Sequence, residues 1–204
     1  MRAIFLDRDG VICENRSDYV KSWSEFQFLP GAQQSLAALS RLGLPMIVVT
    51  NQSAVGRGII SANTVEEIHQ RMAAEVTAYG GRIDRVIYCP HHPEEKCECR
   101  KPKPGMLLKA AKEMGIELTR SYLIGDAVTD LLAAQQVGCQ SFLVLTGRGF
   151  QQLISALCLV DQPFTITHNL MGAMNYILRA ELQITDPLEE RDPYTRHYSQ
   201  LLPG

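Results

Sequence analysis

Residues 3–10 read AIFLDRDG, and this stretch decides how the rest of the chain is interpreted. Its first four residues are apolar and contain no turn former, so they predict a short buried strand. Asp7 and Asp9 follow at a spacing that would point both carboxylates to one side of a chain still extended there, and Gly10 lets the chain turn away. Carboxylates crowded at the end of a buried strand resist ionising together, and a divalent cation relieves that conflict. A solvated acidic pair is the alternative for these residues taken alone.

The composition is that of an ordinary globular protein. The chain has 204 residues, of which 46% are hydrophobic and 21% are charged. This length predicts one domain with a sizeable core. We expect the domain to cover residues 1–184, followed by a polar tail at residues 185–204 that lies on the surface or is partly disordered. The formal net charge of −2 argues against a nucleic-acid-binding protein that relies on a basic surface.

The apolar segments are too short for a membrane span or a signal peptide. No apolar run approaches the roughly 18 residues that cross a bilayer, and the first run is interrupted at Asp7. We therefore expect a cytoplasmic monomer that acts on a small molecule, with neither nucleic acid nor a membrane as partner. In that compartment the six cysteines are expected to be thiols or metal ligands rather than disulfides.

Strand and helix patterns alternate along most of the chain. Further strands are predicted at residues 46–49, 82–89, 122–124 and 141–145, and helical patterns lie at residues 36–42, 64–79, 106–114, 128–137, 153–159 and 170–184. Thr64 and Glu67 have the spacing of a capping box, which predicts a helix start at Thr64. The alternation predicts an α/β fold, a Rossmann-like parallel sheet with helices on both faces. The long connection at residues 11–30 leaves the first strand and is well placed to cover a ligand there.

Polar side chains follow the second and fourth predicted strands. Residues 50–53 read TNQS and could donate hydrogen bonds to an anion, although a plain polar turn is the commoner role of such a run. Arg57 lies between two glycines in the next loop. Asp126 follows Gly125 at the end of the fourth strand and can face Asp7 and Asp9, because the carboxyl ends of parallel strands share one edge. Three carboxylates suit Mg²⁺; a helix N-cap is the alternative role for Asp126.

A cysteine and histidine cluster, CPHHPEEKCEC, occupies residues 89–99. Its C-x-H-x5-C-x-C spacing supplies four soft ligands for a closed, structural Zn²⁺ site. The predicted ligands are Cys89, His91, Cys97 and Cys99. His92 is an alternative to His91, and unligated thiols are the alternative to the site. Arg100 and Lys101 follow directly, and a zinc-bound loop would hold them rigidly against an anion, whereas alone they would form a solvated basic turn.

Taken together, these motifs resemble the haloacid-dehalogenase-like phosphatases, and within them the family of heptose-bisphosphate and histidinol-phosphate phosphatases. The resemblance runs from about residue 2 to residue 149 and rests on DRDG, TNQS, CPHHP, CECRKPKPGM and GDAVTD. It implies a magnesium-dependent phosphomonoesterase with a zinc-bound loop. The connection at residues 11–30 is too short for a large cap domain, so we expect an open site.

The resemblance also implies roles for individual residues. Asp7 would be the nucleophile that forms an aspartyl-phosphate, and Asp9 would be the general acid and then the general base. We expect the Asp7 carboxylate to raise the pKa of Asp9 and so to keep its proton in place. Mg²⁺ would be held by Asp7, the backbone carbonyl of Asp9, and Asp126. The residues expected to bind the phosphate or other parts of the substrate are Thr50, Asn51, Gln52, Ser53, Arg57, Arg100 and Lys101.

The substrate expected from the resemblance is D-glycero-D-manno-heptose 1,7-bisphosphate, dephosphorylated at position 7. Residues 104–106 (PGM) and 19–23 (YVKSW) are similar to the heptose branch, and histidinol phosphate or another small sugar phosphate is the alternative. Cys13 and Ala127 depart from the family pattern, which commonly has asparagine and a polar residue there. Two alternatives of other kinds remain. A non-enzymatic, zinc-stabilised binding module is expected to lack Asp7, Asp9 or Lys101, and all three are present. A nucleic-acid 3′-phosphatase is expected to carry a broad basic groove, which a net charge of −2 does not indicate.

Overall fold

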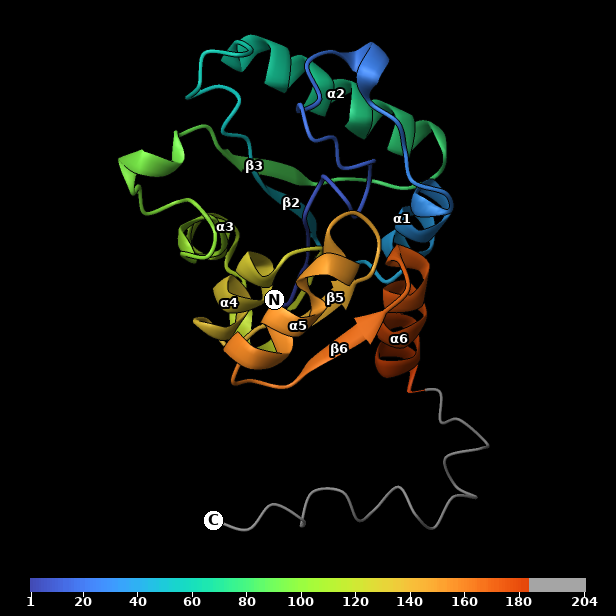
Figure 1. Ribbon diagram of the computed structural model, residues 1–204. Coiled ribbons are helices and arrows are strands. Elements are labelled where there is room, and N and C mark those ends of the chain that lie inside the picture. Colours follow the sequence, from blue (N-terminus) through green and yellow to red (C-terminus); the bar gives the residue numbers. More distant parts are fainter. Residues whose placement is uncertain (184–204) are drawn as a thin grey trace.

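The structure is a computed structural model that describes residues 1–183 and contains a six-stranded parallel sheet (Figure 1). The strands are β1 (Ile4–Leu6), β2 (Met46–Asn51), β3 (Arg85–Cys89), β4 (Tyr122–Gly125), β5 (Gln140–Val144) and β6 (Phe164–Thr167). Their order is β3-β2-β1-β4-β5-β6, with every neighbouring pair parallel. The strand order therefore reverses between β1 and β4. In open sheets of this kind, ligands bind beyond the carboxyl ends of the strands at that reversal.

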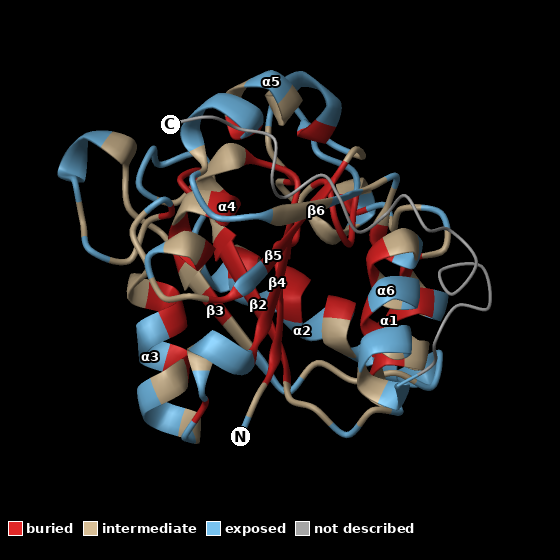
Figure 2. Cartoon of the chain, turned by 90° about the horizontal axis from the view of Figure 1, so that it is seen from below, coloured by how far each residue is buried: buried red, intermediate tan, exposed pale blue. Residues whose placement is uncertain are grey.

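Helices cover both faces of the sheet, as predicted. They are α1 (Ala32–Ser40), α2 (Ala62–Ala78), α3 (Gly105–Met114), α4 (Val128–Gln135), α5 (Gly149–Leu159) and α6 (Leu170–Leu182). Figure 2 shows the buried sheet edge-on between α3 on one side and α1 and α6 on the other. Ile4 and Leu6 share a core with α1, α2 and α6, whereas Phe5 packs with α3 and α4, because successive strand side chains point to opposite faces. None of the helices within residues 1–183 could cross a membrane.

The elements differ from the predicted ones at several boundaries. Helix α2 begins at Ala62 and is capped by Ser61, whose hydroxyl accepts a hydrogen bond from the Thr64 backbone N–H at 3.0 Å. The predicted capping box of Thr64 and Glu67 is therefore wrong. Helix α5 begins at Gly149 instead of residue 153, and the sequence analysis missed β6. The tail predicted at residues 185–204 lies outside the described residues.

Candidate active site

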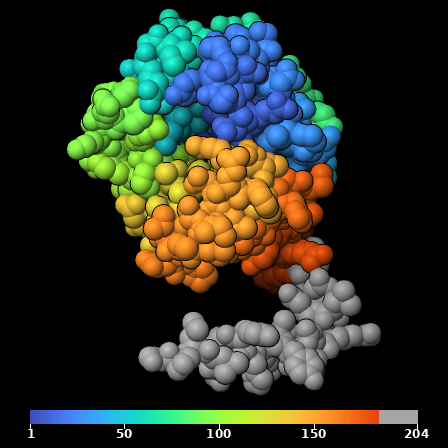
Figure 3. Space-filling view, in the orientation of Figure 1, coloured from blue at the N-terminus to red at the C-terminus, as the bar shows by residue number. Residues whose placement is uncertain are grey.

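An open cavity of about 520 Å³ lies at the carboxyl ends of β1 and β2 and beside the start of α4. Its floor includes Asp7 and Lys101, and its walls come from the connection after β1, the loop after β2 and the segment that carries Arg100. In Figure 3 the surface is hollowed where the blue N-terminal part meets the green and orange parts of the chain. Among residues 1–183, no large cap domain is inserted above it.

Three carboxylates meet at the base of this cavity, and one of them, Asp7, lines it. Asp7, Asp126 and Asp130 are buried, and one oxygen of each lies within 4.8 Å of the others. Asp7 directly follows β1 and Asp126 directly follows β4, so the edge predicted from the sequence brings them together. Asp126 is not a helix N-cap: Asp130 instead accepts a hydrogen bond from the Ala127 backbone N–H at 3.1 Å. A cluster of buried carboxylate oxygens is the donor set that fits Mg²⁺.

Two glycines make room for the Asp126 carboxylate. A methyl group added at Gly10 would lie 2.1 Å from Asp126 Oδ2, and one at Gly147 would lie 2.3 Å from the same atom. Both glycines also have positive φ, +81° and +57°. Every larger residue would therefore be strained and would displace Asp126.

Burial disfavours the ionised form of the carboxyl groups in the cluster of Asp7, Asp126 and Asp130. Burial raises the pKa of Asp7 to about 7; the Lys101 charge acts in the opposite direction, and Asp130 and Asp126 add to the increase. The pKa of Asp126 is raised to about 6 by burial and by Asp130. Because cationic partners only partly offset these effects, the cluster favours a cation that would neutralise it.

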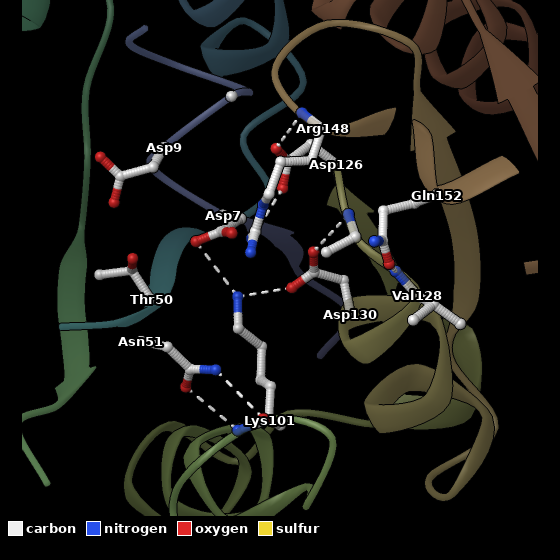
Figure 4. Close-up of polar contacts among 12 residues, drawn as sticks. Asp7, Asp9, Thr50, Asn51, Lys101, Asp126, Val128, Asp130, Arg148 and Gln152 are labelled. Carbon is white, nitrogen blue, oxygen red and sulfur yellow. Dashed lines mark hydrogen bonds and ion pairs between the residues drawn. The ribbon is translucent and has the colours of Figure 1, made fainter. Parts of the chain in front are cut away.

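Lys101 is the ammonium that faces the cluster (Figure 4). Its Nζ lies 3.1 Å from Asp7 Oδ1 and 2.5 Å from Asp130 Oδ1, and it donates to the Val49 carbonyl at 2.7 Å. Burial would lower the pKa of Lys101, but the adjacent Asp130 and Asp7 raise it. Lys101 is therefore charged and held beside the carboxylate predicted to be the nucleophile.

Asn51 holds Lys101 through its main chain. The Asn51 amide donates to the Lys101 carbonyl and accepts from the Lys101 N–H, both at 3.1 Å. The sequence predicted that Asn51 binds phosphate, but in this structure its amide is engaged with the segment that supplies Lys101. Thr50 Oγ1 accepts a hydrogen bond from Gln52 at 3.0 Å, so its hydroxyl proton is available to donate.

Asp9 does not face Asp7. Strand β1 ends at Leu6, so the extended spacing that would align the two carboxylates is not present. Figure 4 shows Asp9 turned away from Asp7 and Lys101. Its carboxylate pairs with Arg8 and accepts hydrogen bonds from Gln52 and Cys13. Burial would raise the pKa of Asp9, but Arg8 and these donors lower it, so the expectation that Asp7 raises it is wrong for this arrangement.

The remaining predicted residues lie in the cavity walls. Gln52 lines the cavity, but its amide already contacts Arg8, Asp9 and Thr50. Ser53 and Arg57 also line it. Arg100 lines it with a buried Nη1 that has no hydrogen-bond partner among the described residues, as expected of a group that awaits an anion.

Sequence reasoning assigned no role to three charged residues of the site. Arg8 lies inside the DRDG stretch, Asp130 one helical turn after Asp126, and Arg148 beyond β5. The Arg148 backbone N–H donates to Asp126 Oδ2 at 2.8 Å, and its guanidinium lies 3.4 Å from Asp126 Oδ1. The position of Arg148 after a predicted parallel strand was the available signal, because such residues reach the same edge as Asp7.

The predicted zinc ligands come together beside the cavity. The four ligand atoms of Cys89, His91, Cys97 and Cys99 lie within 4.8 Å of one another. The Cys97 Sγ is 3.5 Å from each of the other two sulfurs, near the roughly 3.8 Å that tetrahedral Zn–S bonds of about 2.3 Å require. His92 instead accepts a hydrogen bond from the Glu94 N–H, which favours His91 as the ligand. The donor set fits Zn²⁺.

Known proteins share much of this sequence. Residues 98–172 match the HAD-hydrolase-like family model. The D-glycero-β-D-manno-heptose-1,7-bisphosphate 7-phosphatase of Pseudomonas aeruginosa is 41% identical over 150 residues, which cover 74% of this chain and 84% of that protein. The enzyme of the same name from Pseudomonas putida is 43% identical over 153 residues, which cover 75% of this chain and 87% of that protein.

A solved structure agrees over nearly the whole described chain. The D,D-heptose 1,7-bisphosphate phosphatase of Bordetella bronchiseptica, crystallised with magnesium and phosphate, has a TM-score of 0.84 and 34% sequence identity, and the match covers 88% of this chain and 99% of that one. The chain belongs to the haloacid-dehalogenase-like phosphatases. The family and fold predicted from the sequence are therefore confirmed.

Proposed function

We propose that this chain is a magnesium-dependent phosphatase that removes the 7-phosphate of D-glycero-D-manno-heptose 1,7-bisphosphate. The observation that carries the proposal is Asp7 on the cavity floor, 3.1 Å from the Lys101 ammonium and within 4.8 Å of two further carboxylates. The names of its relatives from two Pseudomonas species support the substrate, and the magnesium and phosphate in the Bordetella enzyme support the cofactor. We further propose one domain at residues 1–184 that acts as a cytoplasmic monomer.

The chemistry proceeds through the Asp7 carboxylate. One Asp7 oxygen attacks phosphorus while the bond from phosphorus to the substrate oxygen breaks, giving an aspartyl-phosphate and an alkoxide that takes a proton. Water then attacks the phosphorus of the aspartyl-phosphate and loses a proton while the bond from phosphorus to the Asp7 oxygen breaks, which releases inorganic phosphate and restores the Asp7 carboxylate. Mg²⁺, held by Asp7, Asp126 and the Asp9 carbonyl, would neutralise charge on the phosphoryl oxygens. The Lys101 ammonium and the Thr50 hydroxyl stabilise the same oxygens.

Asp9 is the group proposed to give and take the proton. Its carboxylate is paired with Arg8 in the present arrangement, and Arg8 Nη2 lies 2.9 Å from both Asp9 oxygens. Reaching the leaving oxygen beside Asp7 therefore requires rotation of the Asp9 side chain away from Arg8. The ion pair favours ionised Asp9, which is the form needed to accept a proton from water. Once rotated away from Arg8, the carboxyl group no longer has this cationic partner and can carry the proton that it gives to the leaving oxygen.

The cavity walls favour a substrate with a second anionic group. Arg57 and Arg100 line the cavity, and neither forms an ion pair with a carboxylate among residues 1–183. A phosphate at the far end of a bisphosphate would neutralise these guanidinium groups with paired hydrogen bonds. Histidinol phosphate would instead bring its ammonium group toward them, and like charges repel.

A phosphate-release panel tests the proposed function. Wild-type protein with MgCl₂ is compared on both anomers of heptose 1,7-bisphosphate, histidinol phosphate, fructose 1,6-bisphosphate and a 3′-phosphorylated oligonucleotide. We expect kcat/KM for one heptose anomer to exceed that for histidinol phosphate by about 100-fold, as two lost charge-assisted contacts would give. Preference for histidinol phosphate overturns the substrate assignment, and no release from any compound overturns the phosphatase assignment.

Zinc is expected to stabilise the loop that leads into Arg100 and Lys101. Cys97→Ser should lose bound zinc, lower the melting temperature by about 5–10 °C, as a loss of 2–3 kcal/mol gives at this size, and reduce kcat/KM. Metal content and thermal unfolding measure the effect. Cys158→Ser is the matched control, because Cys158 is exposed on α5 and lies outside the cluster. Equal zinc content in the two variants would show that the cluster does not bind zinc.

Gly147→Ala is expected to disrupt the cation site. The added methyl group would displace Asp126, and a shift of about 1 Å in a catalytic group can cost roughly 100-fold in activity. The Mg²⁺ concentration for half-maximal activity should rise as well. Gly43→Ala is the matched control, since Gly43 has φ +73° but no atom within 4 Å of the added methyl group. If both variants lose stability but neither loses activity, Gly147 does not shape the site.

A further inference from the structure

Arg8 is buried between Asp9, with which it forms an ion pair, and helix α2. Only 1% of its surface is exposed. Its Nη2 contacts both Asp9 oxygens at 2.9 Å and also donates to Gln52 Oε1 at 3.0 Å. Gln52 in turn donates from Nε2 to Asp9 Oδ2 at 2.8 Å. Arg8 and Gln52 therefore hold the Asp9 carboxylate from two sides, and they also contact each other.

His69 completes this network from α2. Its Nε2 lies 3.2 Å from Arg8 Nη1, and the residue is 5% exposed. A guanidinium can only donate, so Nε2 must accept and the imidazole must be neutral at that atom. Burial and the Arg8 charge lower the pKa of His69 to about 3, which is consistent with this arrangement. His69 thus satisfies the one guanidinium nitrogen that faces away from Asp9.

A neutral acceptor is what this position requires. A carboxylate on α2 would compete with Asp9 for the Arg8 charge, and an apolar side chain would leave a buried N–H without a partner. A neutral imidazole holds Arg8 in place without competing with Asp9 for the charge of the guanidinium group. No other contact of Arg8 Nη1 is found among the described residues.

We propose that His69 is a positioning residue: it holds Arg8, and Arg8 fixes the resting position of the Asp9 carboxylate. Asp9 rotates from that position to the leaving group and then returns to it. This inference rests on the proposed phosphatase function. Without His69, Arg8 gains alternative positions, and Asp9 follows it because their contacts are charge-assisted. Proton transfer to the leaving oxygen is then impaired, whereas attack by Asp7 is not.

The choice of leaving group separates an effect on proton transfer from an effect on attack by Asp7. A sugar alkoxide needs a proton as it departs, but p-nitrophenolate is a much weaker base and departs without one. The value of kcat/KM reports steps through formation of the aspartyl-phosphate, so it isolates the first proton transfer. The test measures kcat/KM for the best sugar phosphate of the panel and for p-nitrophenyl phosphate, with Mg²⁺ present.

His69→Asn and His69→Gln are the informative pair. The Gln oxygen reaches the place of Nε2 and accepts from Arg8, whereas the shorter Asn amide does not. We expect His69→Asn to lower kcat/KM for the sugar phosphate by about 10–100-fold, part of what a general acid contributes, and for p-nitrophenyl phosphate by less than about threefold. His69→Gln should stay within about threefold of wild type for both, and Asp9→Asn should show the same selectivity as His69→Asn with a larger loss.

Met72→Leu is the packing control, because Met72 is buried on the same face of α2 one turn later. It should leave both kcat/KM values unchanged. Equal losses of His69→Asn on the two substrates, no loss on either, or failure of His69→Gln to restore the sugar phosphate reaction would each overturn the positioning role while wild-type activity stands. Absence of release by the wild type from both substrates overturns the proposed function and this inference with it.

Discussion

Asp7→Asn is expected to lower kcat for phosphate release by about 10⁴-fold or more, since the amide cannot act as the nucleophile that the mechanism requires. No phosphate should remain covalently attached to the variant in rapid acid quench, whereas a labelled wild-type intermediate should be trapped. The asparagine retains the volume of Asp7 and an oxygen that can accept from the Arg8 N–H, a contact of 2.7 Å in this structure. The loss of activity should therefore come from the missing nucleophile and not from a change in the fold.

The same variant should remain folded. Asp7→Asn removes one of three buried charges that lie within 4.8 Å of one another, so in EDTA at pH 8 the melting temperature should equal or exceed that of the wild type. Asp161→Asn, the same change at an exposed residue after α5, is the control for both measurements. Residual activity above about 1% would indicate that another group forms the covalent bond, and a large fall in melting temperature would indicate a structural role for the Asp7 charge.

The sequence predicted the parts of the fold that are buried on both faces. Strands β1 and β4 are buried along their whole length, and β2 begins with the buried apolar residues 46–49; all three lie in the middle of the sheet, so an uninterrupted apolar run identifies them. Strand β6 is an edge strand of four residues, two of them threonine and none fully buried, and such a segment carries no apolar run. The helix start at Ala62 was missed because the cap is a lone serine three residues before Thr64.

The site was predictable where topology alone places its residues. Asp7 and Asp126 follow neighbouring parallel strands, and the zinc cluster lies within 11 residues, so sequence distance and strand order suffice. Side-chain direction was not predictable, because it depends on contacts between distant residues. Asn51 turns to the Lys101 main chain, and Asp9 turns to Arg8 once β1 ends at Leu6.

The pairing of Lys101 with Asp130 illustrates the same limit. The two residues come from the segment after the zinc cluster and from the first turn of α4, and each is nearly fully buried. Sequence analysis placed Lys101 beside the phosphate but had no basis for choosing its partner. In the structure the ammonium contacts both Asp130 and Asp7, so that it lies beside the nucleophile, buried away from solvent.

Lys101→Met is expected to lower kcat/KM by about 100–1,000-fold, the range for removal of one charge-stabilising donor. It should also lower the free energy of unfolding in EDTA by about 3–5 kcal/mol, because it leaves buried carboxylates without their counter-charge. Urea unfolding at pH 8 measures the second effect. Lys103→Met is the matched control: Lys103 is two residues away, is 41% exposed at its side chain, and pairs with the exposed Glu98. A surface pair of that kind contributes about 0–1 kcal/mol.

A double variant separates the two roles of Lys101. If Asp130 is the carboxylate left unpaired, Asp130→Asn added to Lys101→Met should recover about 1–3 kcal/mol of the lost free energy of unfolding, the usual coupling between contacting charged residues. It should recover none of the activity, because the ammonium that faces the phosphoryl oxygens is still missing. Additive losses in the double variant would show that the 2.5 Å contact between Lys101 and Asp130 carries no coupling energy. Recovered activity would mean that Lys101 acts only by neutralising Asp130.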